Sequence, residues 1–191
     1  MRVDISPWSA LILALFIWLC GTMLLLAVLF AALCHELGHY FLLRRLGVAV
    51  KTLYITPFGA AMELGNRCRL SYGGELLAAA AGPAVNLLLS AVMAWLGQWW
   101  EAFYLFAGAQ LVLGVFNLLP VLPLDGSALL WNTVAWCCEP YTADRIAHIV
   151  SFLFSFLIIV AALVLWLVTG TPFLLVGAFG LFWHNVVKKD L

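Results

Sequence analysis

The chain has 191 residues, of which 66% are hydrophobic and only 9% are charged, and nine Lys plus Arg balance nine Asp plus Glu. Ordinary soluble domains carry roughly 25% charged residues, so a soluble globular domain and a disordered chain are both excluded. The lack of a basic excess argues against nucleic acid as a partner. We expect one membrane domain over residues 1–191, with the lipid bilayer as its surroundings.

The first apolar run, residues 8–34, contains no charged residue and is longer than one membrane span. A transmembrane helix needs roughly 20 apolar residues, and Gly21 divides the run near its middle. We therefore predict a short helix over 8–20 and a longer one over 22–46. The longer helix ends in two arginines with Gly47 just beyond them, which is typical of a helix C-terminus.

Residues 48–64 interrupt the helical pattern. They are rich in β-branched residues and surround a Pro57-Phe58-Gly59 turn signal. The sequence predicts a small membrane-associated β-hairpin here, between the second and third helices.

Later apolar runs predict further helices, and a proline-rich turn over 119–126 separates two of them. A shorter segment over 127–138 is expected to be helical and partly interfacial. The predicted fold class is an all-α polytopic membrane protein with about six transmembrane helices, over residues 8–20, 22–46, 75–97, 102–119, 146–168 and 173–187.

The distribution of basic residues predicts the orientation of these helices. With a cytoplasmic N-terminus and alternating spans, all nine Lys and Arg fall in cytoplasmic segments. This agrees with the excess of Lys and Arg found on the cytoplasmic side of membrane proteins. We expect a multi-pass protein of the cell membrane with both termini in the cytoplasm.

The helix predicted over 22–46 contains His35-Glu36-Leu37-Gly38-His39. Ionisable residues near the bilayer centre cost about 2.5–3.5 kcal/mol each on insertion scales, so they usually mark function. Positions i and i+4 share a helix face, where two imidazoles can bind zinc and the intervening Glu36 can reach a water on the metal. The alternative is a polar cluster that bonds a neighbouring helix, as in proton or ion transport.

Catalytic zinc needs a third protein ligand and one open position. Asp125 lies at a matching depth, and we expect it at the cytoplasmic end of the helix over 102–119, just inside the proline-rich turn. The alternative is an Asp-Gly turn residue. Charge balance favours the ligand, because Zn²⁺ with ionised Asp125 and Glu36 sums to zero. We expect one Zn²⁺ per chain, bound by His35, His39 and Asp125.

Together these residues resemble the site-2 protease family of intramembrane zinc metalloproteases. The matching motifs are HELGH over 35–39, Gly-Pro-Ala-Val-Asn over 82–86 and NLLPVLPLDG over 117–126. The resemblance covers about residues 8–130 and is nearest to the stage IV sporulation protein FB-like branch. The chain ends without the CBS domain common in that branch, so we expect regulation by that domain to be absent.

The resemblance implies an intramembrane zinc metalloendopeptidase that cleaves membrane-associated or transmembrane proteins near the cytoplasmic face. A sporulation sigma-factor pro-sequence, or another substrate of regulated proteolysis, would be its target, and a membrane-protein inhibitor or regulator its partner. Glu36 would be the general base. Asn117 and Asn86 are the catalytic candidates for oxyanion donors, although each can instead bond a neighbouring helix.

Two other functions stay open. The first is a catalytically silent relative that binds membrane proteins, against which the intact Glu36 argues. The second is a small transporter or metal carrier, which needs polar residues spread along several helices rather than gathered at one depth. We expect His148 and His184 to be interfacial polar residues outside the site.

Overall fold

The computed structural model describes residues 2–5, 21–56, 59–64, 70–170, 175 and 177–182. They belong to two units, Met1–Phe116 and Asn117–Leu191. The helix predicted over 8–20 lies outside the described residues. Of the helix predicted over 173–187, the described residues 175 and 177–182 are helical.

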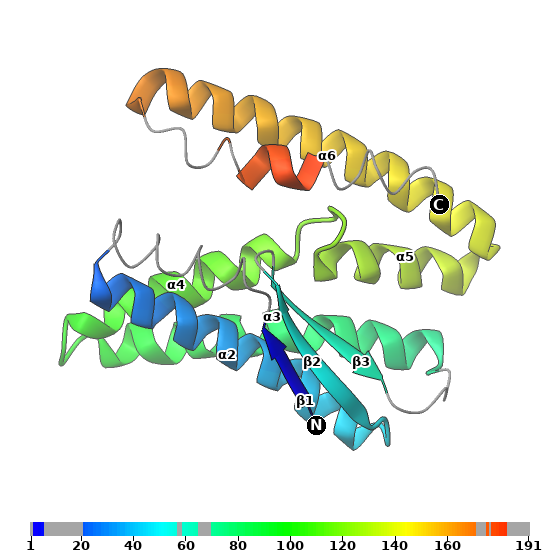
Figure 1. The fold of residues 1–191 in the computed structure, drawn as a ribbon, viewed down its shortest axis with the longest axis horizontal. Helices are drawn as coiled ribbons and strands as arrows, with labels where there is room; N and C mark the ends of the chain where they lie inside the picture. Colours follow the sequence, from blue (N-terminus) through cyan, green and yellow to red (C-terminus); the bar gives the residue numbers. More distant parts are fainter. Residues whose placement is uncertain are drawn as a thin grey trace. The chain divides into compact units, whose positions relative to one another are not determined.

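The first unit places a small sheet beside membrane helices (Figure 1). Its elements are β1 (Arg2–Ile5), α2 (Thr22–Arg45), β2 (Val50–Thr56), β3 (Gly59–Leu64), α3 (Tyr72–Leu96) and α4 (Ala102–Asn117). The second unit contains α5 (Asp125–Cys137) and α6 (Pro140–Thr169).

The strands follow the order β1-β2-β3. β2 and β3 pair antiparallel, with Leu53 opposite Met62, which is the hairpin expected between the second and third helices. β1 adds a parallel third strand, with Val3 opposite Leu53. The sequence did not predict β1, because a strand of four residues is too short to show a period.

The helices predicted over 22–46, 75–97, 102–119 and 127–138 correspond to α2, α3, α4 and α5. α6 begins six residues before the predicted start at 146, because Pro140 occupies the first helical turn, where its missing N–H costs nothing. In the part of the chain that the structure describes, α2, α3 and α6 are long and apolar enough to cross a membrane, and α4 is a shorter apolar helix.

Close packing between α2 and α3 depends on a small residue. A Cβ on Gly38 of α2 would lie 2.8 Å from the carbonyl oxygen of Ala81 in α3. On α2, Ala27 and Ala31 are almost fully buried.

α3 begins at a capping residue, Ser71, whose Oγ accepts a hydrogen bond from the backbone N–H of Gly74 at 3.2 Å.

The second unit has its own small core of Val121, Leu124 and Leu181. The backbone N–H of Leu122 donates to Ser151 Oγ of α6 at 2.8 Å, which ties the proline-rich turn to that helix.

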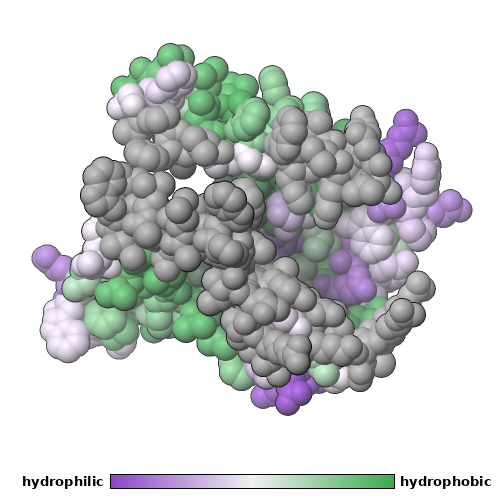
Figure 2. All heavy atoms as spheres, viewed as in Figure 1, coloured by the Kyte–Doolittle hydropathy of each residue, from purple (hydrophilic) through white to green (hydrophobic). Residues whose placement is uncertain are grey.

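Large apolar side chains cover the outer surfaces of the helices, as the green areas of Figure 2 show. On α6, Leu167 and Val168 are 74% and 79% exposed. A water-soluble protein rarely exposes apolar surface on this scale. These helices therefore belong in a bilayer, and the chain is a membrane protein.

Candidate metal centre

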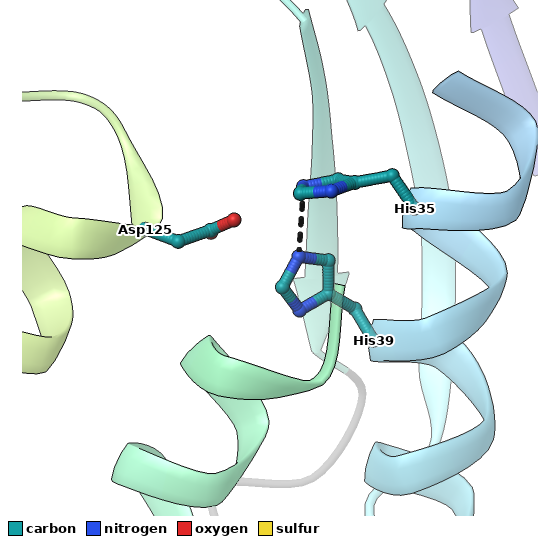
Figure 3. Close-up of side chains that lie close together, drawn as sticks. All are labelled: His35, His39 and Asp125. Carbon is teal, nitrogen blue, oxygen red and sulfur yellow. Dashed lines mark hydrogen bonds between the residues drawn. The ribbon is translucent and has the colours of Figure 1, made fainter. Parts of the chain in front are cut away.

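Two imidazoles stand one helical turn apart on the same face of α2. The Nε2 atoms of His35 and His39 are 3.2 Å apart, and the rings meet edge to face at 78° (Figure 3). His35 is buried and His39 is half-buried. The i, i+4 spacing thus brings two nitrogen donors together within a membrane span, as the sequence predicted.

The protonation of His39 is fixed by its second nitrogen. His39 Nδ1 lies 2.7 Å from the carbonyl oxygen of Ala78 in α3. A carbonyl only accepts hydrogen bonds, so Nδ1 carries the proton and donates it to this bond. Nε2 then presents its lone pair toward His35. Metal-binding histidines are commonly oriented by such a bond from the other ring nitrogen.

The spacing of the two nitrogens suits a zinc ion. Zn–N bonds of about 2.0–2.1 Å at a tetrahedral angle place two ligand nitrogens roughly 3.3–3.4 Å apart. The observed separation of 3.2 Å is close to that value. The donor pair therefore fits a tetrahedral zinc site that takes its remaining ligands from elsewhere.

Gly82 of α3 makes room for both rings. A Cβ at this position would overlap Nε2 of His39 and lie 2.8 Å from Cε1 of His35. Any larger residue would push the imidazoles out of place. The first glycine of the Gly-Pro-x-x-Asn motif is thus explained by packing against the His35–His39 pair.

Glu36 is half-buried on α2, directly after His35. A carboxylate inside a membrane helix is costly and usually marks function.

Asp125 is the first residue of α5, not the end of the preceding helix as the sequence suggested. α4 ends at Asn117, because Pro120 and Pro123 cannot continue a helix, and Leu124 is the N-cap of α5. A carboxylate is favoured in a first turn by the positive end of the helix dipole. Next to it, a Cβ on Gly126 would overlap the carbonyl oxygens of Leu118 and Leu119.

The two candidate oxyanion donors lie on different helices. Asn86 is fully buried on α3, one turn beyond Gly82, and Asn117 is the half-buried last residue of α4. His148 is exposed on α6, and His184 lies outside the described residues.

Sequence reasoning missed two features of this region. One is the Ala78 carbonyl, which no motif could indicate because any residue supplies a carbonyl. The other is Gln110, a fully buried amide in the apolar helix α4. Its polarity within an apolar run was the available signal.

The chain matches the family model "Peptidase family M50" over residues 23–100 and 95–161. The chain therefore belongs to peptidase family M50, and the resemblance to the site-2 protease family is confirmed.

Several curated proteins are similar to it. The Rip3 protein of Mycobacterium tuberculosis is 34% identical over 132 residues, covering 61% of this chain and 32% of the relative. Stage IV sporulation protein FB of Bacillus subtilis is 29% identical over 69% of this chain and 47% of its own. Zinc metalloprotease MJ0392 of Methanocaldococcus jannaschii is 27% identical over 130 residues, which cover 64% of this chain and 34% of the relative. The chain thus spans about a third to a half of these relatives.

A solved structure titled "Site-2 Protease from Methanocaldococcus jannaschii" has the same fold. The TM-score is 0.71, with 19% sequence identity over 97% of this chain and 90% of the other. At this identity the likeness concerns the fold.

Proposed function

We propose that this chain is an intramembrane zinc metalloendopeptidase, which hydrolyses peptide bonds of membrane-associated or transmembrane proteins near the cytoplasmic face. The observation that carries the proposal is the His35–His39 pair, with Nε2 atoms 3.2 Å apart and the His39 tautomer set by Ala78. Glu36 stands on the same helix, beside this pair. Membership of a peptidase family supports the same conclusion.

One Zn²⁺ per chain would be bound by His35, His39 and Asp125. Two imidazoles and one carboxylate are a common ligand set for catalytic zinc and leave one coordination position for water or substrate. Ionised Asp125 and ionised Glu36 each carry one negative charge. Together they would balance the two positive charges of Zn²⁺, so that no net charge is buried in the membrane.

When bound, the zinc ion would make a water molecule acidic and polarise the scissile carbonyl. Glu36 accepts the proton of the attacking water as the water's oxygen bonds to the carbonyl carbon. The same carboxyl group then delivers the proton to the amide nitrogen as the C–N bond breaks.

Asn117 and Asn86 are the proposed donors to the oxyanion of the tetrahedral intermediate. Asn117 ends α4 and is half-buried, which suits a direct hydrogen bond. Asn86 is fully buried one turn beyond Gly82 on α3, so its amide would act on the reaction centre through water.

The sheet offers a means of holding the substrate extended. β3 forms one edge of the described sheet. An unwound substrate segment could add to this edge through backbone hydrogen bonds, which exposes carbonyls that a helix hides. Such a peptide would be presented as a strand.

The chain would be a multi-pass protein of the cell membrane with both termini in the cytoplasm. A sporulation sigma-factor pro-sequence is one proposed substrate, supported by the similarity to stage IV sporulation protein FB, and another substrate of regulated proteolysis is the alternative. A membrane-protein inhibitor or regulator is the proposed partner.

Zinc analysis and a cleavage assay on one set of purified proteins test the proposal. The protein, Glu36→Gln and His35→Ala would be purified in detergent and assayed for zinc and for cleavage of unfolded β-casein. We expect one zinc per chain and cleavage in the native protein, zinc without cleavage in Glu36→Gln, and neither in His35→Ala. Folded native protein that takes up no zinc would refute the protease and leave a silent binding protein. Normal cleavage by Glu36→Gln would refute the mechanism.

A further inference from the structure

Two buried side-chain amides lie in the first unit outside the metal-binding pair. Asn86 of α3 and Gln110 of α4 are both 0% exposed. Among the residues that the structure describes, neither the oxygen nor the nitrogen of either amide has a hydrogen-bond partner. Buried amides in native proteins are nearly always satisfied, by protein or by ordered water.

The packing of α3 against α4 brings both amides to one interface. Ser90 Oγ of α3 donates to the carbonyl oxygen of Ala107 in α4 at 2.9 Å. Four residues earlier on α3, the Cβ of Asn86 lies 3.1 Å from where Gly114 would carry a Cβ. The helices are therefore antiparallel in this register, and Gln110 falls between the two contacts on the buried face of α4.

The same interface leads to the imidazoles. Gly82, which packs against His35 and His39, lies one turn before Asn86 on the buried face of α3. Four residues of helix rise about 6 Å along the axis. On α2, Ala31 and Ala27 continue the face of His35 and are 1% and 0% exposed. Gly82 thus links the two places, because it packs against both imidazoles and lies one turn from Asn86 on the same face of α3.

Two fully buried amides at one helix–helix interface are a setting in which proteins hold internal water. A buried water makes about three hydrogen bonds and needs two to four polar partners. Asn86 and Gln110 together offer donors and acceptors of both kinds. A peptide or other large ligand is excluded, because neither amide has exposed surface.

We propose that Asn86 and Gln110 bind ordered water between α3 and α4, where Asn86 lies one helical turn from Gly82, the residue that packs against His35 and His39. This water site would stand whether or not the chain is a protease. Its further role rests on the proposed function: peptide hydrolysis consumes one water per bond cut, and the amides would hold water next to the centre that consumes it.

The glutamine content of the chain allows a direct test. The sequence has two glutamines, Gln98 and Gln110. Gln98 is exposed, whereas Gln110 is fully buried. Labelling only glutamine side-chain nitrogens with ¹⁵N in the full chain, in deuterated detergent, gives two side-chain amide signals. Gln110→Met assigns them by removing one.

We expect the Gln110 amide to show a rotating-frame Overhauser cross-peak to water, with the sign that distinguishes proximity from proton exchange. Asn86→Leu should weaken this cross-peak by at least half and leave the Gln98 signal unchanged. A Gln110 signal without a water contact, or with a contact that Asn86→Leu leaves unchanged, would overturn the shared site. If the two amides bonded directly to each other, the Gln110 signal would show no water contact.

Thermal stability gives a second test, in which the direction of the change in Tm distinguishes hydrated amides from unsatisfied ones. If the amides are hydrated, Gln110→Met and Asn86→Leu lose hydrogen bonds and lower Tm by roughly 2–4 °C for a chain of this size. If the amides are unsatisfied, the same apolar replacements raise Tm. Gln98→Met is the matched control, with no expected change. A rise in Tm of both buried variants would refute the water site.

Cleavage assays then test the consequence for catalysis. We expect both buried variants to lower kcat several-fold with unchanged KM and zinc content. Water contacts without an effect on kcat would confirm the water site and remove its catalytic role. Failure to bind zinc in the native chain would instead refute the proposed function and leave the spectroscopic result intact.

Discussion

Replacing Gly82 with alanine tests the packing that holds His35 and His39 in position for the proposed zinc ion. The added Cβ would overlap Nε2 of His39 and lie 2.8 Å from Cε1 of His35. To restore van der Waals contact, the rings must retreat by about 1 Å. Zinc–ligand distances tolerate only about 0.2 Å, so the two nitrogens would lose their common binding position.

The expected loss of zinc affinity follows from this displacement of the rings. Overpacking of this kind costs about 1–3 kcal/mol, and perturbing groups that orient metal ligands lowers metal affinity by about 10–100-fold. We expect Gly82→Ala to remain folded and to bind zinc at least 10-fold more weakly than the native protein. Cleavage should fall in parallel at limiting zinc.

Zinc affinity would be measured by competition with a chromophoric chelator in detergent. Gly108→Ala is the matched control, since it makes the same change in the apolar helix α4, where a Cβ meets nothing within 4 Å. Alanine stabilises a helix relative to glycine by up to about 1 kcal/mol, so this control should stay folded. Because its added methyl group meets no neighbouring atom, it should also keep full zinc affinity. Equal zinc affinity in Gly82→Ala and Gly108→Ala would refute the packing argument.

Three other substitutions test separate parts of the structure. Glu36→Gln should keep zinc and lower cleavage at least 100-fold, because general acid–base catalysis contributes about 10²–10⁴; cleavage of β-casein measures it. Asp125→Ala should weaken zinc binding in the chelator assay, and unchanged affinity would remove Asp125 from the ligand set. Ser71→Ala should cost about 1 kcal/mol by removing the N-cap of α3, since its Oγ accepts from Gly74. Unchanged Tm in Ser71→Ala would show that this cap does not stabilise the helix.

Local sequence patterns predicted several elements of the fold and the histidine pair. The apolar run ending in two arginines defined α2, and the i, i+4 histidines defined the paired imidazoles, because helix geometry alone sets that spacing. The hairpin of β2 and β3 was likewise readable from β-branched residues around a turn signal.

Other features depended on contacts between distant segments. β1 forms by pairing with a strand about fifty residues away, and four residues carry no periodic signal of their own. The start of α5 at Asp125 was misplaced, because the sequence shows the prolines that stop a helix but not which residue caps the next one.

By itself, the sequence determined that the chain lies in a membrane, that it carries a histidine pair and a carboxylate on one helix, and that it resembles a peptidase family. The first two properties follow from composition and from spacing along a single helix, and the resemblance follows from three motifs spread over residues 35–126. Only the tertiary structure determined that the Ala78 carbonyl fixes the His39 tautomer, that Gly82 leaves space for both rings, and that Gln110 is buried in the α3–α4 interface. Each of these depends on the approach of a second helix, which no local pattern encodes.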